Sequence, residues 1–129
     1  MSDDTCCGSG DVLISACAGA ANVGEVTDRA DRRLMADGAG RMFCLTGMGA
    51  DIEGMVQSAK DSERNLVIAG CPVNCAAKVF ERLGISNYEQ ITVTDLGIEK
   101  VLGVWANDDQ VEQVVDCARK TLDEGLTEE

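Results

Sequence analysis

The chain of 129 residues contains no histidine, and this absence restricts its possible chemistry. Histidine is the commonest metal ligand in proteins and the commonest general acid or base in enzymes. Every catalytic triad that depends on an imidazole is therefore excluded. A metal ion bound by this chain would need thiolate or carboxylate ligands.

Positive charge is also scarce, with 11 Lys and Arg residues against 23 Asp and Glu residues and a net charge of −12. Binding to phosphate groups needs clustered Lys and Arg, so the composition argues against nucleic acid as a direct partner. No segment approaches the roughly 18 consecutive apolar residues of a membrane span, and residues 1–10 are polar and acidic, unlike a signal peptide. The sequence therefore predicts a cytoplasmic protein without a nucleic-acid or membrane partner. It does not identify a protein partner.

Cysteine, in contrast, is abundant, with seven residues in the chain. At this length and with 45% hydrophobic residues, one domain can bury a sufficient core without disulfides. Seven cysteines in a chain with cytoplasmic features therefore favour metal or redox chemistry. We expect a flexible tail at residues 1–10 that contains Cys6 and Cys7, an α/β metal-binding domain at 11–124, and a short acidic tail at 125–129.

Alternating apolar patterns predict the fold. Short apolar runs predict strands at residues 11–16, 41–45, 65–69 and 91–94. Helical spacing predicts helices at 23–36, 51–59, 72–83 and 108–122, with Asn22 as the N-cap of the first. This alternation is typical of a single three-layer α/β domain of the flavodoxin-like or Rossmann-like kind. We expect a mainly parallel sheet of four to five strands with helices on both faces, the fifth strand lying near residues 102–105 and Trp105 in the core.

Three cysteines recur at a constant interval in this pattern. Cys17, Cys44 and Cys71 lie 27 residues apart, and each closes a short apolar run that predicts a strand. Cys75 comes four residues after Cys71, in the predicted helix that begins at Pro72. Because parallel strands deliver their carboxyl ends to one edge of the sheet, we expect the four thiols to converge there.

Zinc is the metal that best suits four converging thiolates. It prefers tetrahedral sulfur ligands at about 2.3 Å, and the spacing of Cys71 and Cys75 falls within the range of known zinc motifs. Residues four apart on a helix share a face, so these two thiols could bind one ion. We therefore predict a Zn²⁺ site formed by Cys17, Cys44, Cys71 and Cys75, with a role in metal sensing, storage or delivery.

Several short motifs in fixed order resemble one known family. They are Ala16-Cys17-Ala18-Gly19, Met42-Phe43-Cys44-Leu45-Thr46-Gly47-Met48-Gly49, Val67-Ile68-Ala69-Gly70-Cys71-Pro72-Val73-Asn74-Cys75 and Thr94-Asp95-Leu96-Gly97. The chain resembles the DGC-domain family of zinc-binding proteins from about residue 11 to residue 100. The resemblance implies zinc ligands at Cys17, Cys44, Cys71 and Cys75 but names no reaction. One departure is Ala69, which occupies the position of the aspartate in the Asp-Gly-Cys motif that gives the family its name.

Two alternatives to zinc binding remain open. The first is a thiol-dependent redox or sulfur-transfer enzyme with Cys17 or Cys71 as nucleophile, since the N-terminus of a helix lowers thiol pKa values. The second is an iron–sulfur protein, since thiolates also ligate iron.

The roles of the remaining candidate residues are less defined by the sequence. Asp95 ends the fourth predicted strand and is equally compatible with a role in the site and with a turn. Cys6 and Cys7 are expected to be a reactive pair in the tail rather than ligands. Cys117 is expected in the core or partly exposed, and Lys78 and Lys100 are expected to be solvated.

Overall fold

The computed structural model describes residues 12–127 of the chain, which form one three-layer α/β domain. The strands are β1 (Val12–Ala16), β2 (Arg41–Met42), β3 (Arg64–Ala69) and β4 (Glu89–Thr92). The helices are α1 (Asn22–Ala36), α2 (Leu45–Gly49), α3 (Glu53–Asp61), α4 (Cys75–Arg82) and α5 (Asp108–Thr127), and a 3₁₀ helix, η1 (Val93–Leu96), follows β4.

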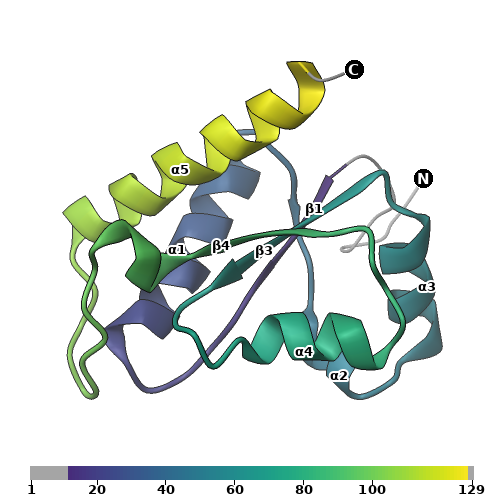
Figure 1. Cartoon of the computed structure of the whole chain (residues 1–129), viewed down its shortest axis with the longest axis horizontal. Coiled ribbons are helices and arrows are strands. Elements are labelled where there is room, and N and C mark those ends of the chain that lie inside the picture. The colour runs from purple at the N-terminus through teal and green to yellow at the C-terminus, as the bar shows by residue number, and fades with distance from the viewer. Residues whose placement is uncertain (1–11, 128–129) are drawn as a thin grey trace.

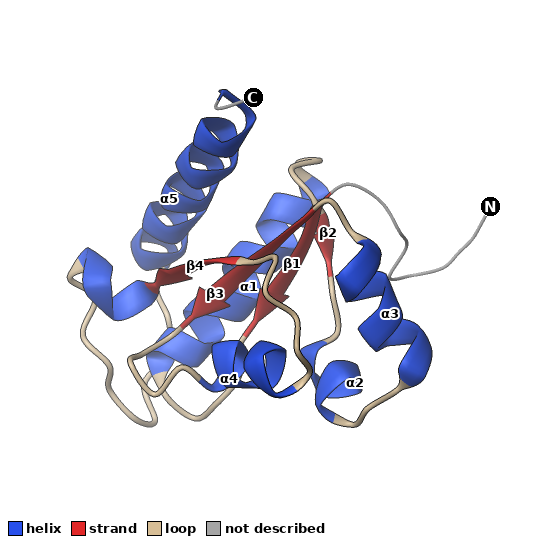
Figure 2. Cartoon of the chain, turned by 45° about the vertical axis from the view of Figure 1, so that its right-hand side comes forward, coloured by secondary structure: helices blue, strands red, loops and turns tan. Residues whose placement is uncertain are grey.

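The four strands form one parallel sheet in the order β2-β1-β3-β4. Helices α1 and α5 cover one face, while α2, α3 and α4 cover the other (Figures 1 and 2). The predicted fold class, with helices on both faces of a mainly parallel sheet, is therefore confirmed. Cys6, Cys7 and the predicted tail at 1–10 lie outside the described residues, as does the end of the predicted acidic tail.

Each face of the sheet has its own hydrophobic core because successive strand residues point to opposite sides. Ile14, Leu66 and Ile68 pack against α1 and α5. Leu13 and Val67 pack on the opposite face with a second set of side chains, Phe43, Met48, Ala59, Ala76, Phe80 and Ile85. The two central strands therefore hold the layers together without a disulfide among the described cysteines.

Several details differ from the sequence-based expectation. The second strand ends at Met42, because the chain turns into α2 at Leu45. The segment at 101–105 adds no strand to the sheet and makes only a single antiparallel bridge, between Leu102 and Ala21. Trp105 is 85% exposed and not in the core, because this segment lies against the loop before α1, beyond the sheet. Within residues 12–127, none of the helices has the length and apolar character that a bilayer crossing requires.

Candidate thiol site

Cys17 follows β1 directly, and its sulfur is held against the end of β3. The backbone N–H of Cys17 donates to the carbonyl oxygen of Ile68 over 3.2 Å. Its Sγ accepts a hydrogen bond from the backbone N–H of Gly70 over 3.1 Å. The hydroxyl of Thr27 donates to the carbonyl oxygen of Cys17 over 2.8 Å.

Small residues allow this close packing at the strand ends. A Cβ added to Gly70 would lie 3.2 Å from the Sγ of Cys17 and 3.1 Å from a methyl carbon of Val23. A Cβ added to Gly24 would lie 2.9 Å from the backbone nitrogen of Gly19. Both approaches are tighter than ordinary van der Waals contact, so larger residues here would displace the Cys17 loop.

Cys71 lies two residues beyond β3 and is half-buried. A hydrogen bond from the backbone N–H of Val73 and the nearby ammonium of Lys100 lower the pKa of the Cys71 thiol, while partial desolvation opposes them. The Nζ atom of Lys100 lies 3.4 Å from the Sγ of Cys71. Lys100 is exposed, as expected for a solvated lysine, and it also supplies positive charge to this thiol.

Asn22 positions Lys100, although the two residues are far apart in the sequence. Its amide nitrogen donates to the carbonyl oxygen of Glu99 over 2.9 Å, and its amide oxygen accepts from the backbone N–H of Val101 over 2.7 Å. The backbone N–H of Asn22 also donates to the carbonyl oxygen of Val101. Asn22 was expected to cap the first helix, but Ala21 occupies the N-cap position, and the Asn22 side chain holds the loop on both sides of Lys100.

Cys75 is the first residue of α4 and is exposed. The helix was expected to begin at Pro72, but Asn74 adopts a left-handed conformation with φ of 62°, and the helix starts only after it. The amide of Gln90 donates to the Oδ1 atom of Asn74 over 2.9 Å. The inference that Cys71 and Cys75 share a helix face is therefore wrong, because Cys71 precedes the helix.

The fourth predicted ligand, Cys44, is positioned by helix α2. It is exposed and is the N-cap residue of α2, where its Sγ accepts a hydrogen bond from the backbone N–H of Gly47 over 3.3 Å. Because β2 is short, α2 begins close to the sheet edge and fixes this thiol at its own N-terminus. The cap thus explains the position of Cys44.

A cavity of about 190 Å³ lies at the carboxyl edge of the sheet, lined by Cys17, Cys71, Cys75 and Lys100. The remaining wall consists mainly of small residues from the loop at 18–21 and from Ala69 and Gly70. The structure therefore brings three of the four predicted ligands to one cavity, and Cys44 does not line it. Within residues 12–127, no three cysteine or acidic side chains are grouped closely enough to hold a metal ion as they stand.

The other sequence candidates lie outside this cavity. Asp95 is exposed on η1, and Cys117 is half-buried on α5. Lys78 is exposed on α4 and does not line the cavity, in agreement with the expectation that it is solvated. Sequence reasoning missed Asn22 and Lys100 as site residues, because their roles arise from a contact between distant segments.

Comparison with known proteins identifies the family. The chain is 28% identical over 91 residues to the anaerobic and virulence modulator AnvM of Pseudomonas aeruginosa, and the match covers 70% of each chain. No solved structure matches the chain. Residues 13–118 match the DGC domain, and this range includes the sheet except Val12, all the residues that line the cavity and the first half of α5. The chain therefore belongs to the DGC-domain family.

Proposed function

We propose that this protein binds a thiophilic metal ion, Zn²⁺, at the carboxyl edge of its sheet. The observation that carries the proposal is the convergence of Cys17, Cys71 and Cys75 on one cavity. Thiolates are the ligands that zinc prefers for closed sites. In this proposal Cys44 is the fourth ligand, reached by movement of the segment around the start of α2.

The surroundings of the sulfurs fit an anionic ligand set. Backbone N–H groups donate to the sulfurs of Cys17, Cys44 and Cys71, and hydrogen bonds of this kind orient and tune metal-bound thiolates. Lys100 adds a positive charge beside Cys71. Four thiolates around Zn²⁺ carry a net charge of −2, which this lysine partly offsets.

Metal binding by these residues requires rearrangement. A zinc site needs its sulfurs at about 2.3 Å from the ion, whereas the described side chains are not grouped in this way. The thiols therefore have to move toward the cavity centre, and the small residues of the surrounding loop permit this. Since two hydrophobic cores already hold the domain together, the metal in this proposal is cargo, signal or cofactor, in keeping with sensing, storage or delivery.

Elemental analysis of the full chain, purified in parallel with and without oxygen, tests the proposal. We expect about one zinc per chain, as in a four-thiolate site. Replacement of Cys17, Cys71 or Cys75 by serine should remove the metal, whereas Cys117→Ser should not, because Cys117 lies on α5 outside the cavity. Cys44→Ser tests whether the fourth thiol is a ligand. Substoichiometric metal in both preparations, or equal losses in all variants, would refute the zinc proposal.

The lowered pKa of Cys71 favours a second function, thiol-dependent redox or sulfur-transfer chemistry. In this reading Cys71 acts as the nucleophile because its thiolate is favoured by the Val73 N–H and Lys100. This second function would be supported if, in metal-free purified protein, Cys71 reacted with a small disulfide far faster than Cys117. A brown protein that contains iron would instead support the iron–sulfur alternative.

A further inference from the structure

Four apolar side chains lie exposed in a row on the loop before α5. We call them the apolar strip: Val101, Leu102, Val104 and Trp105. Leu102 is 71% exposed and Trp105 is 85% exposed, which are high values for large apolar side chains. Single exposed apolar residues are common on soluble proteins, whereas contiguous groups mark contact surfaces.

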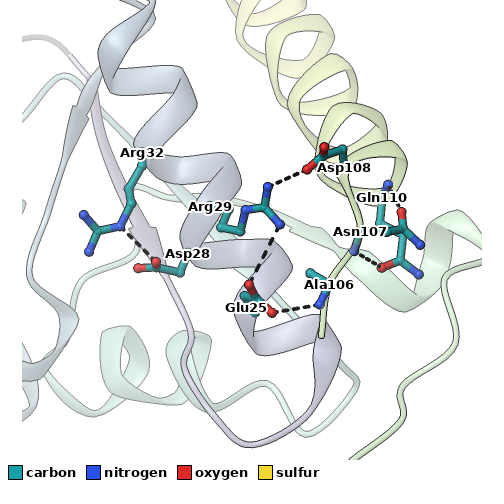
Figure 3. A network of polar contacts seen from close by, with 8 residues as sticks. All are labelled: Glu25, Asp28, Arg29, Arg32, Ala106, Asn107, Asp108 and Gln110. Carbon is teal, nitrogen blue, oxygen red and sulfur yellow. Dashed lines mark hydrogen bonds and ion pairs between the residues drawn. The ribbon is translucent and has the colours of Figure 1, made fainter. Parts of the chain in front are cut away.

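Hydrogen bonds hold the backbone of this strip in place. Val101 is bound to Asn22 through both its N–H and its carbonyl oxygen, and the N–H of Gly103 donates to the carbonyl oxygen of Ala20 over 3.1 Å. The loop is also fixed at its far end, where the N–H of Ala106 donates to Glu25 over 2.7 Å (Figure 3).

The start of α5 is fastened to α1 as well. Arg29 lies between Glu25, at 3.8 Å, and Asp108, at 2.6 Å, as Figure 3 shows. The apolar strip is therefore held between two anchored segments, and its side chains face solvent while its backbone is fixed. A surface that is already ordered loses little conformational entropy when a partner binds, and exposed Trp side chains are typical of binding hot spots.

We propose that the apolar strip is a docking surface for another protein, through a segment that combines apolar residues with lysines or arginines. The charges around the strip favour a partner segment that carries lysines or arginines. Glu99 precedes the strip in the sequence and Asp109 follows it in the first turn of α5; both are exposed, and neither makes an ion pair with another residue in the range 12–127. The cations near the strip are engaged elsewhere, Lys100 with Cys71 and Arg29 with Asp108.

The same charges disfavour a second copy of this chain as the occupant. Two chains that each carry a net charge of −12 would repel one another, and their strips would bring Glu99 and Asp109 of both copies together. A basic partner gains attraction from the same groups. The proposal goes beyond metal binding and does not depend on it.

The strip is continuous with the thiol cavity. Leu102 lines the cavity mouth together with Val73, which is also largely exposed. A partner on the strip would therefore cover part of this mouth.

Trp105 is the only tryptophan in the chain, so its fluorescence reports on the strip directly. The probe is a synthetic amphipathic peptide of leucine and lysine, added to the full chain at physiological ionic strength. We expect saturable binding with a blue shift of Trp105 emission, and no shift with the matching leucine–glutamate peptide. Leu102→Ser/Val104→Ser should weaken binding about tenfold or more, as expected for truncated hot-spot residues.

The matched control is Ile52→Ser, because Ile52 and Val104 are both 49% exposed and Ile52 lies before α3, outside the strip. This variant should bind the peptide like the parent chain. A second variant, Glu99→Lys/Asp109→Lys, keeps the apolar side chains and should lose the preference for the lysine peptide. Circular dichroism checks that each variant is folded.

Several results would overturn the proposal. They are the absence of saturable binding, binding that leaves Trp105 emission unchanged, and equal weakening by the strip and Ile52 substitutions. A blue shift that grows with protein concentration alone would identify a second copy as the occupant. A larger blue shift with phosphatidylcholine–phosphatidylglycerol vesicles than with the peptide would identify a lipid surface.

Discussion

The carboxyl group of Asp31 offers a test of how burial controls the pH dependence of stability. Asp31 lies in α1 with no exposed surface, and neither carboxylate oxygen has a hydrogen-bond partner in the described part of the chain. Burial raises the pKa of Asp31 from 3.8 to about 8, with a further contribution from Asp28 that Arg32 opposes. Asp31 is therefore mainly protonated at neutral pH in the folded protein and ionised in the unfolded chain.

The direction of this pH dependence follows from proton binding by the Asp31 carboxyl group. Between pH 4 and pH 8 the folded state holds a proton that the unfolded state releases, so the free energy of unfolding falls as the pH rises. The slope is about 1.4 kcal/mol per pH unit, so Asp31 lowers stability by about 4 kcal/mol between pH 4 and pH 7. Below pH 4 the Asp31 side chain is protonated in both states and no longer lowers the free energy of unfolding.

Asp31→Asn isolates this effect because the amide has nearly the same shape and remains neutral at every pH. Relative to the parent chain, the variant should gain about 4 kcal/mol of unfolding free energy at pH 7, and the gain should vanish near pH 4. Urea unfolding followed by circular dichroism across this range measures the difference. Asp123→Asn, at an exposed position on α5, is the matched control and should show little pH-dependent change. A gain that does not vary with pH would refute the reasoning.

Three further predictions concern the thiol site. In metal-free protein at neutral pH, Lys100→Met should raise the pKa of Cys71 and slow the alkylation of this thiol by iodoacetamide severalfold. Peptide mass spectrometry measures the alkylation rate, and an unchanged rate would contradict the role assigned to Lys100. Gly70→Ala should destabilise the domain by about 1–3 kcal/mol, because the Cβ of the new alanine would press on the sulfur of Cys17. In thermal melts, the control Gly54→Ala should be neutral or stabilising, because the space around Gly54 is open. A strong chelator should lower the melting temperature of metal-loaded protein but leave its circular dichroism spectrum helical, because the two hydrophobic cores hold the domain together without metal. Complete unfolding at room temperature would show that the metal is required for the fold.

The sequence was sufficient to predict the layered fold, because its periodic signals are local. The first helix, α1 (Asn22–Ala36), lies within one residue of its predicted bounds, since its apolar positions recur at helical spacing. The strand ends also place Cys17 and Cys71 at one edge of the sheet. These features depend on the pattern within each segment and on the rule that parallel strands end together.

The details that escaped prediction depend on contacts between distant segments or on single backbone conformations. Trp105 was expected in the core because it follows a run of apolar residues, but Asn22 and Ala20 bind this run outside the sheet. The left-handed conformation of Asn74 delays the start of α4, and no periodic signal marks it. Cys44 was expected at a strand end, but the early start of α2 places it at a helix cap.

The contact between Asn22 and the loop at 99–101 also determines when the thiol cavity can form during synthesis. The four cysteines of the predicted site all leave the ribosome before Lys100 does, so the nascent chain carries these thiols without the cation and without the wall that Leu102 provides. Contacts between segments so distant in sequence form slowly, since a long loop must close first. We therefore expect Cys71 to acquire its partial burial and its lowered pKa late in folding. A chain that stops before residue 99 would expose its cysteines without acquiring the site.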